Sequence, residues 1–375
     1  MIRILQCVNN MHRAGLETML MNYYRRVDRD VIQFDFLTHR PEKDDYDDEI
    51  EELGGKVYHA PRLYPQNMHA YSKYMHAFFK EHPEYKIMHS HIDAMSYLPL
   101  REGKKAGVPI RIAHSHNTSV DKDFKKPLKM YYRSRISSVA TEFLACGKEA
   151  GDFLFPGKDA LVIPNAIDKK KFVYDSLTRE NKRRELGITD ETVFGHVGRI
   201  SYQKNHDMLV QIFANIVKKK PDSILLIIGV GEKEQEIREK VHALGITDKV
   251  RFLGKRTDVN ELYQAMDVFV MPSFFEGVPV VGVEAQFAKL LCFFSDKVPD
   301  EVAFTDSTYF IPLAKSPEKW ASDILYNLER APKRENIEIL DDRYDIDKAY
   351  ICLENYYKNL YDNLKETSYE KSTIN

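Results

Sequence analysis

The sequence has few cysteines, no long apolar run and no excess of charge of one sign. The four cysteines among its 375 residues form no CxxC pair and have no metal-ligand spacing, so we expect reduced thiols in a cytoplasmic protein. No stretch approaches the roughly 18 apolar residues of a membrane span, and the N-terminus lacks the features of a signal peptide. The formal net charge of -2 gives no general case for nucleic acid binding.

The chain alternates short apolar runs with amphipathic ones, over a length that predicts two domains. Continuous apolar strands that alternate with helices indicate parallel sheets covered on both faces. The rhythm restarts near residues 162–172, so the predicted fold class is α/β, with two doubly wound domains in tandem. Strands are expected at 2–8, 34–38, 56–59, 87–91, 110–114, 142–146 and 160–163, then at 192–197, 223–228, 249–253, 268–271, 290–295 and 309–312.

Polar and glycine-containing motifs follow most of these strands. In open α/β sheets, ligands bind beyond the carboxyl ends of the strands, so these motifs are expected to share one edge of each sheet and to line a common cleft. The residues in these positions are Gly198, Arg199, Gly229, Arg256 and Glu276 in the second half, and His91, His114 and His116 in the first half.

Several of these motifs resemble those of the retaining glycosyltransferases of family four (GT4), which have the GT-B fold. The segments are GRISYQKN, LLIIGVGE, VIPNAID and FLGKRTDVNELYQAMDVFVMPSFFEGVPVVGVEA. AHSHN and MHRAGLETMLMNYYRR are similar to members that build bacterial capsular and exopolysaccharides. The resemblance covers about residues 1–365. It implies two Rossmann-like domains facing a central cleft: an acceptor domain at 1–165, completed by a crossover helix at about 345–365, and a nucleotide-sugar domain at 166–344.

Arg199 and Lys204 lie just before a predicted helix that begins near Asn205. A helix N-terminus carries a partial positive charge, and two cations beside it can neutralise a diphosphate and stabilise it as it leaves. A solvated loop is the alternative. The glycine next to Arg199 and the glutamates of FFEGVPVVGVEA favour the diphosphate site.

Glu276 and Glu284 flank the start of another predicted helix, which is expected to begin at Pro279. The resemblance implies that Glu284 accepts hydrogen bonds from the donor ribose and that Glu276 faces the sugar ring. It places the backbone of Gly277, Val278 and Val280 against sugar and phosphate, and we expect Gly198, Gly229 and Arg256 to contact the donor as well. Paired carboxylates also occur in glycosidases, about 5–10 Å apart, but that interpretation is weaker here because each glutamate has a separate binding role.

The resemblance also implies contributions from the first domain. Gly15 matches the second position of the Gly-Gly loop of the family, where a backbone amide approaches the diphosphate, whereas Ala14 departs from the pattern at the first. A histidine after the fifth strand lies beside the reaction centre, and both His114 and His116 are candidates. We favour His116, because His114 can still point along the strand into the core; His91 remains open, as does a purely structural role for all three.

Other motifs exclude cofactors. Gly229-Val230-Gly231 lacks the third glycine of a dinucleotide site, because Glu234 stands there. Asp121-Lys122-Asp123 and Asp345-Ile346-Asp347 match the DxD metal motif of another glycosyltransferase fold, but neither follows a suitable strand. We therefore expect no metal and no cofactor besides a nucleotide sugar, most simply a UDP-sugar.

The predicted activity is transfer of a hexose-type sugar from a nucleoside diphosphate, with retention, to a glycan or lipid-linked glycan. A nucleotide-sugar epimerase and a catalytically silent sugar-nucleotide-binding subunit are the alternatives. A basic segment in the acceptor domain adds a hypothesis, because residues 101–135 hold ten Lys or Arg and three acidic residues, with Phe124, Tyr131 and Tyr132 among them. Such a surface predicts peripheral binding to an anionic membrane, with a solvated basic helix as the alternative.

Overall fold

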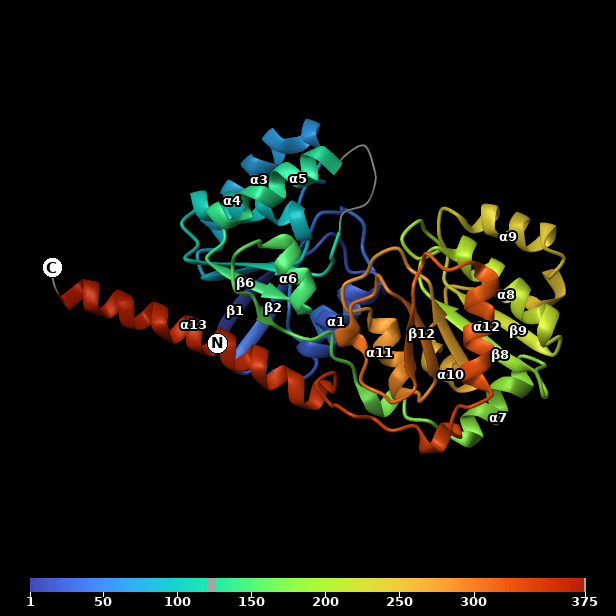
Figure 1. Cartoon of the computed structure of the whole chain (residues 1–375). Helices are drawn as coiled ribbons and strands as arrows, with labels where there is room; N and C mark the ends of the chain where they lie inside the picture. Colours follow the sequence, from blue (N-terminus) through green and yellow to red (C-terminus); the bar gives the residue numbers. More distant parts are fainter. Residues whose placement is uncertain (120–125, 374–375) are drawn as a thin grey trace. The chain divides into compact units, whose positions relative to one another are not determined.

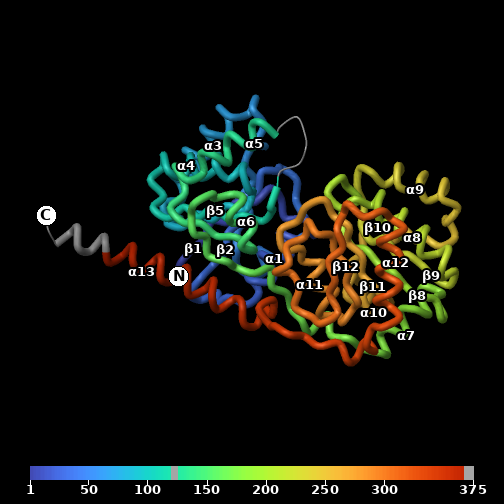
Figure 2. The backbone as a smooth tube through the Cα atoms, viewed as in Figure 1, coloured from blue at the N-terminus to red at the C-terminus, as the bar shows by residue number. Residues whose placement is uncertain are grey.

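The computed structural model describes residues 1–119 and 126–373, those from 367 on as backbone only, and divides into two compact units (Figure 1). Unit 1 comprises Met1–Ala166 and Arg343–Asn375, and unit 2 comprises Ile167–Asp342. The tube in Figure 2 shows that the terminal helix belongs with the N-terminal unit although it is last in the chain.

Unit 1 is built on a parallel sheet with the strand order β3-β2-β1-β4-β5-β6-β7. Its strands are β1 (Ile2–Cys7), β2 (Ile32–Thr38), β3 (Val57–His59), β4 (Ile87–Ser90), β5 (Ile110–Ser115), β6 (Glu142–Ala145) and β7 (Leu161–Val162). Its helices are α1 (Gly15–Tyr24), α2 (Asp47–Glu52), α3 (Met68–Glu81), α4 (Tyr97–Lys105), α5 (Lys126–Arg135), α6 (Lys148–Leu154) and α13 (Ile346–Thr373), with short 3₁₀ turns η1 (Pro65–Asn67), η2 (Asp93–Ser96) and η3 (Ile136–Ser138).

Unit 2 repeats this plan with the parallel order β10-β9-β8-β11-β12-β13. Its strands are β8 (Thr192–Val197), β9 (Ser223–Ile228), β10 (Val250–Gly254), β11 (Val268–Met271), β12 (Leu291–Ser295) and β13 (Thr308–Ile311). Its helices are α7 (Ser176–Glu185), α8 (His206–Lys219), α9 (Glu234–Ala243), α10 (Val259–Ala265), α11 (Val280–Phe287) and α12 (Pro317–Leu328), with 3₁₀ turns η4 (Lys169–Lys171), η5 (Thr247–Lys249), η6 (Asp300–Val302) and η7 (Arg334–Asn336).

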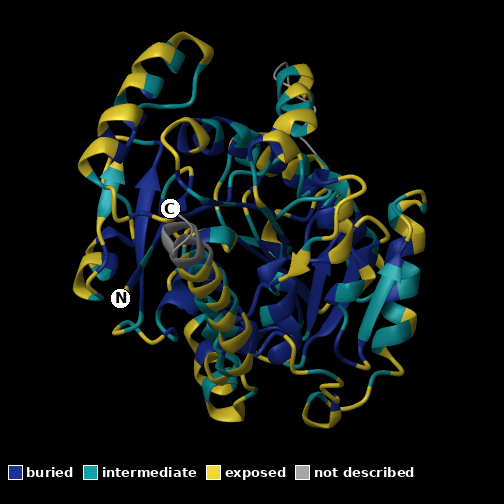
Figure 3. Cartoon of the chain, turned by 90° about the vertical axis from the view of Figure 1, so that its left-hand side faces the viewer, coloured by how far each residue is buried: buried dark blue, intermediate teal, exposed yellow. Residues whose placement is uncertain are grey.

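The central strands of both sheets are buried on both faces and are dark in Figure 3, whereas the edge strands β3, β7, β10 and β13 are partly exposed. In unit 2, side chains of α8, α9 and α12 form one core with alternate residues of the strands, including the single tryptophan, Trp320. On the opposite face, the Phe269 ring of β11 lies 6.0 Å from the ring of Tyr263 in α10. In unit 1, α3 and α4 cover one face, while on the other Tyr357 of α13 packs edge-on against Phe34 of β2. The prediction of two doubly wound parallel sheets is confirmed.

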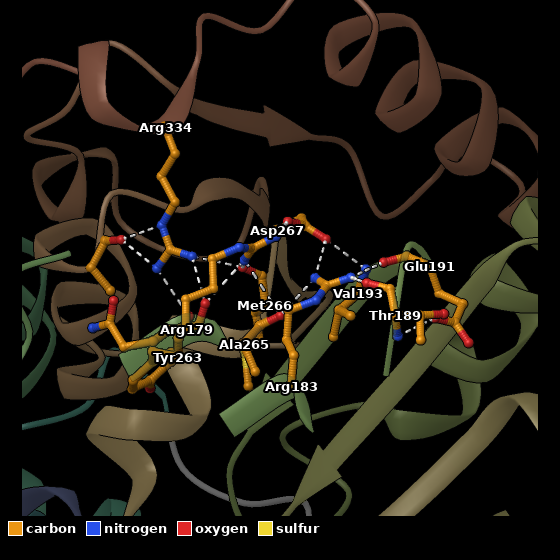
Figure 4. Close-up of polar contacts among 12 residues, drawn as sticks. Arg179, Arg183, Thr189, Glu191, Val193, Tyr263, Ala265, Met266, Asp267 and Arg334 are labelled. Atoms are coloured by element: carbon orange, nitrogen blue, oxygen red, sulfur yellow. Dashed lines mark hydrogen bonds and ion pairs between the residues drawn. The ribbon is translucent and has the colours of Figure 1, made fainter. Parts of the chain in front are cut away.

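Polar groups at the amino-terminal edge of the unit 2 sheet are paired within the protein (Figure 4). Asp267, directly before β11, accepts hydrogen bonds from Arg179 of α7 at 2.5 Å and from the backbone N–H of Val193 at 2.8 Å. Arg334 donates to backbone carbonyls at the ends of α10 and α11, among them Tyr263 at 3.0 Å and Ala288 at 2.7 Å. These contacts satisfy helix-end carbonyls and join secondary-structure elements that are far apart in sequence.

Candidate active site

The polar motifs meet where the strand order of each sheet reverses. The reversal lies between β1 and β4 in unit 1 and between β8 and β11 in unit 2. Loops that leave neighbouring strands in opposite directions at such a point open a crevice, which is the usual ligand site of this architecture. The charged motifs after β8 and β11 lie at the switch point of unit 2, and histidines at the end of β4 lie at the switch point of unit 1.

Lys204 and Glu276 are in direct contact in unit 2. The Lys204 Nζ atom lies 2.8 Å from Glu276 Oε1, and the side chains are only 15% and 7% exposed. Gln203 donates to the other carboxylate oxygen at 3.2 Å and to the Phe275 carbonyl at 3.0 Å. The loops after β8 and β11 are thereby joined, and one positive and one negative charge stand side by side at the switch point.

The left-handed backbone of Asn205 (φ 53°) directs the chain from Lys204 into α8. Its side chain accepts a hydrogen bond from Met208 N and donates one to the Pro272 carbonyl at 3.0 Å. Asparagine tolerates this conformation better than most residues and is a favoured N-cap. The predicted N-cap thus also ties the helix start to the loop that carries Glu276.

Arg199 differs from Lys204 in its surroundings. Its side chain is 74% exposed and forms an ion pair with Glu232 at 3.0 Å. An exposed pair of this kind contributes at most about 1 kcal/mol, so the guanidinium can exchange Glu232 for another anion at small cost. Arg199 and Lys204 lie in the same loop between β8 and α8, but each pairs with a different carboxylate: Arg199 with Glu232 and Lys204 with Glu276.

The glycines after β8 and β9 allow two loops to touch. A Cβ atom on Gly229 would lie 2.1 Å from the Gly198 carbonyl oxygen, and one on Gly198 would lie 3.2 Å from Lys204 Cε. Gly229 also has φ 129°, a conformation that side chains rarely adopt. Both glycines therefore have a packing reason to be present, in addition to the donor contacts predicted for them.

The helix predicted to begin at Pro279 begins one residue later, at Val280. Pro279 has an extended ψ of 119° and acts as the N-cap, because its carbonyl accepts the first helical hydrogen bond, from Gly282 N at 2.9 Å. Its ring supplies the helical φ but the turn itself starts at the next residue. Gly277, Val278 and Val280 are buried in this approach to the helix.

Glu284 lies in α11 and is held by Tyr263, whose hydroxyl donates to Glu284 Oε2 at 3.0 Å. Burial raises the pKa of the Glu284 carboxyl to about 7, and the hydrogen bond from Tyr263 opposes that shift. The structure therefore gives the two glutamates different environments: Glu276 beside a lysine, and Glu284 beside a phenol.

Arg256 is engaged away from these groups. Its Nε and Nη2 atoms form a two-point hydrogen bond with Asp258 at 2.7 and 2.6 Å, and Glu185 lies 3.6 Å from Nη2. Lys182 joins the same network through Asp258 at 2.9 Å. Arg256 thus connects β10 to α7 and α10, and its predicted donor contact stays a prediction.

In unit 1, four histidines from β4 and β5 form two layers at the switch point. His89 Nε2 lies 3.1 Å from His114 Nδ1, with the rings 8° from parallel; His91 Nδ1 lies 3.0 Å from His116 Nε2. The layers stack, with ring centroids 4.0 Å apart for His89 and His91 and 4.1 Å for His114 and His116. His114 is buried and His116 is partly exposed.

Three residues that the sequence did not single out hold this stack. Gln6 of β1 and Tyr357 of α13 contact the two histidines that come from β4 and its end. Gln6 Oε1 lies 2.8 Å from His91 Nε2, and the Tyr357 hydroxyl lies 2.5 Å from His89 Nδ1. Asp93 accepts a hydrogen bond from the His116 backbone N–H at 2.8 Å. No local motif marks Gln6 or Tyr357, which are 351 positions apart and meet only in the fold.

The other expected or excluded sites have clear places. Gly15 is the exposed first residue of α1, where backbone N–H groups lack helical partners.

The DxD at 121–123 lies outside the described residues. In the second DxD, Asp345 accepts a hydrogen bond from Asp347 N at the start of α13. Among the described residues, the one His/Cys/Asp/Glu group with metal-ligand spacing is His89, His91 and His114. None of the described helices has the length and apolarity needed to cross a bilayer.

The raised pKa of Glu284 makes a testable prediction for the ligand-free protein. The folded state holds this proton up to about pH 7, whereas the ordinary value is 4.5, so its contribution to stability is complete below pH 4.5 and lost as pH rises through 7. Glu284→Gln should therefore gain stability relative to wild type between pH 5 and pH 8, measured by urea unfolding. Tyr263→Phe, which removes the opposing hydrogen bond, should move the change to higher pH. If the unfolding free energies of Glu284→Gln and wild type differ by the same amount at every pH, the raised pKa of Glu284 is wrong.

Comparisons with known proteins show the family of the chain. Residues 178–339 match the family described as glycosyl transferases group 1. The chain is 35% identical over 348 residues to the putative glycosyltransferase EpsF of Bacillus subtilis (strain 168), covering 90% of each protein. It is 24% identical to the capsular polysaccharide biosynthesis glycosyltransferase CapH of Staphylococcus aureus, covering 86% of this chain and 90% of CapH.

Solved structures show the same fold. A crystal structure of Anabaena HepE in complex with UDP and glucose superposes with a TM-score of 0.78 over 96% of this chain and all of that one, at 17% identity. A structure of the lipopolysaccharide glycosyltransferase WaaG superposes with a TM-score of 0.68 over 94% of this chain and 95% of WaaG, at 16% identity. With its two doubly wound sheets and its similarity to EpsF over nearly the whole length, the chain belongs to the group 1 glycosyl transferases and has the GT-B fold.

Proposed function

We propose that this glycosyltransferase moves a hexose-type sugar from a UDP-sugar, with retention of configuration, to a glycan or lipid-linked glycan in bacterial polysaccharide biosynthesis. The observation that carries the proposal is the contact of Lys204 with Glu276 at the switch point of unit 2, where a cation for phosphate and a carboxylate for hydroxyl groups are needed side by side. EpsF and CapH by name, and HepE by its complexes with UDP, glucose and UDP-glucose, support the substrate class.

The two cations would bind the donor diphosphate in different ways. Lys204 is fixed by Glu276 but its ammonium group has three donors, so it can contact a phosphate oxygen without leaving the carboxylate. Arg199 exchanges its exposed partner Glu232 for the diphosphate. Charge that grows on the leaving phosphate is then met by groups already in position, and little reorganisation is required.

Retention in this proposal needs no covalent intermediate. Glu276 is held by Lys204 and Gln203, so we assign it to orienting the sugar ring and not to nucleophilic attack. The acceptor hydroxyl attacks the anomeric carbon from the face that the diphosphate leaves, and a leaving phosphate oxygen takes the hydroxyl proton. Glu284 and the backbone at Gly277, Val278 and Val280 hold the rest of the donor, and His116 lies beside the reacting centre.

Substitution of the two cations tests the diphosphate site. Arg199→Ala should lower kcat by about 10²–10³ with the fold intact, because one preorganised charge contact is lost. Glu232→Ala, the control, frees Arg199 and should leave kcat within about threefold of wild type, within the small value of an exposed ion pair. UDP release with and without acceptor is the assay.

Lys204→Ala should also lower kcat strongly, but it breaks the buried ion pair with Glu276, which costs about 3–5 kcal/mol of stability. The double variant Lys204→Ala with Glu276→Gln restores charge balance, so it should regain stability without regaining activity. Near-normal turnover in either variant would contradict the assignment of Lys204 to the donor diphosphate. UDP-sugar interconversion without acceptor would identify an epimerase instead, and UDP binding without turnover a silent subunit.

Metal independence follows from the same charges. Protein cations and the N-terminus of α8 supply the positive charge that a divalent ion gives to DxD enzymes. Activity should therefore survive saturating EDTA, measured as UDP release before and after dialysis against the chelator. A strict requirement for added Mn²⁺ or Mg²⁺ would contradict the site.

We also propose that α5 attaches unit 1 to an anionic membrane surface, where a lipid-linked acceptor resides at the cytoplasmic face. None of the residues of α5 is buried, and Tyr131 is 51% exposed. Arg135 lies over the Tyr131 ring at 5.7 Å, and Tyr132 stacks on Tyr97 of α4. Basic residues with exposed aromatic rings suit the headgroup region of a bilayer, although Lys122, Phe124 and Lys125 lie outside the described residues.

Co-sedimentation with liposomes tests this surface. Wild type should bind vesicles rich in phosphatidylserine and not neutral ones, since each basic residue contributes about 1 kcal/mol near the surface. Changing Lys125, Lys126 and Lys129 to Glu should release it. The control Lys218→Glu with Lys219→Glu, at exposed positions of α8, reverses the charge of two lysines in unit 2 and should keep binding. Equal binding of all three proteins, or of none, favours a soluble acceptor.

A further inference from the structure

The histidine layers of unit 1 have the geometry of hydrogen-bonded imidazoles. In the His89–His114 pair, a short N···N distance of 3.1 Å combines with nearly parallel rings whose centroids are 5.1 Å apart. Rings that lie edge to edge in this way share a proton between two nitrogens. The His91–His116 pair has the same end-on spacing, with 3.0 Å between nitrogens and 5.3 Å between centroids.

These contacts occupy the facing nitrogens of each histidine pair, and of the three candidate ligands only His114 keeps a buried nitrogen, Nε2, without a hydrogen-bond partner among the described residues. His89, His91 and His114 have ring nitrogens within 4.8 Å of one another, a spacing compatible with ligation. A ligating nitrogen must present a lone pair to the metal, whereas here the facing nitrogens of His89 and His114 lie at hydrogen-bond distance from each other. The geometry therefore favours a proton network over a metal centre.

The positions of the protons in the His91–His116 pair can be assigned from the contact of His91 with Gln6. Its Nε2 donates to the Tyr357 hydroxyl at 3.3 Å, which leaves Oε1 facing His91 Nε2 at 2.8 Å. A carbonyl oxygen only accepts, so His91 Nε2 carries the proton. Burial and the neighbouring histidines lower the pKa of His91 well below its ordinary value, which keeps the ring neutral. A neutral imidazole has one N–H, so His91 Nδ1 accepts from His116 Nε2–H.

We propose that Gln6 and His91 are positioning residues that hold His116 as its Nε2–H tautomer, with an unprotonated Nδ1 available to accept a hydrogen bond from a substrate hydroxyl. The tautomer follows from the contacts and from the neutral state of the buried His91 ring, while the task of Nδ1 rests on the proposed function. Asp93 adds to the constraint, because it fixes the His116 backbone through Oδ1 at 2.8 Å and binds Asn117 Nδ2 through Oδ2 at 2.8 Å. Asp93 has φ 45°, a conformation uncommon outside glycine and favoured by a side chain that bonds locally.

Long-range ¹H–¹⁵N NMR of ¹⁵N-histidine-labelled, ligand-free protein tests the tautomer directly. Wild type should show both His91 and His116 protonated at Nε2, with the His116 signals assigned from a His116→Gln variant. Protonation of His116 at Nδ1 overturns the proposal before any other variant is made. Addition of one equivalent of Zn²⁺ provides a further check: displacement of the His89, His91 and His114 signals with a raised Tm would show a metal site and overturn it too.

Two variants of similar size separate the relay from packing. Gln6→Leu removes the acceptor for His91 Nε2–H, so His91 and His116 should each become a mixture of tautomers. Tyr357→Phe removes the hydroxyl that orients the Gln6 amide but keeps an amide oxygen within reach of His91 Nε2, so part of the His116 Nε2–H population should remain. An unchanged tautomer in Gln6→Leu, or a loss in Tyr357→Phe as large as in Gln6→Leu, contradicts the role of Gln6.

Kinetics then connect the tautomer to the reaction. Gln6→Leu should lower kcat about tenfold with donor KM changed less than about twofold, because His116 Nδ1 no longer holds the substrate hydroxyl in one orientation. In a His116→Ala background the same change should have no further effect. An equal loss in both backgrounds means that Gln6 acts through packing, which overturns the relay while the transferase proposal stands. Full activity of His116→Ala removes His116 from the reaction centre.

Discussion

The polar sites described above depend on one constraint: a parallel sheet that is covered by helices on both faces offers a ligand access only at or near the strand ends. The core of unit 2 shows the consequence, since alternate residues of β8, β9, β11 and β12 pack under α8, α9 and α12. Side chains that must meet a ligand are therefore confined to the loops that follow the strands. At the switch point these loops diverge, and Lys204 and Glu276 meet there.

The same constraint explains why charges are paired differently at the two edges of the unit 2 sheet. At the amino-terminal edge, Asp267 and Arg334 are saturated by the arginines and carbonyls around them. A surface pocket there is lined by Arg179, Arg183 and Asp267, and Asp267 forms ion pairs with both arginines. At the carboxyl edge, Arg199 has one exposed partner and Lys204 retains donors beyond its contact with Glu276. Arg199 and Lys204 thus keep hydrogen-bonding capacity for a ligand, whereas Arg256, which follows β10 at the same edge, is engaged by Asp258.

Unit 1 uses the corresponding position for neutral groups. Four imidazoles, a carboxamide and a phenol from β1, α13 and the ends of β4 and β5 satisfy one another in two stacked layers, and His114 Nε2 is the one buried side-chain atom of this described network without a hydrogen-bond partner. A buried network of this kind is stable only when nearly every member is satisfied, and it then defines a unique arrangement. Tyr357 closes the network from the terminal helix, so α13 contributes to the order of the histidines as well as to the core of unit 1.

The sequence alone determined the α/β class, the strands and the residues placed at their ends. Apolar runs and helical spacing are local signals, and β8, β9 and β11 begin and end where the pattern predicts. The Asn205 cap is also local, whereas the start of α11 was displaced by one residue, because φ of Pro279 fits a helix and its ψ does not. The pairings were decided by the tertiary structure. Which carboxylate holds Lys204, that Asp258 engages Arg256, and that Gln6 faces His91 all depend on loops and strands that meet only after folding. The end of a strand determines where a side chain is attached. Its hydrogen-bond partner and its protonation state depend on the groups that the fold places next to it.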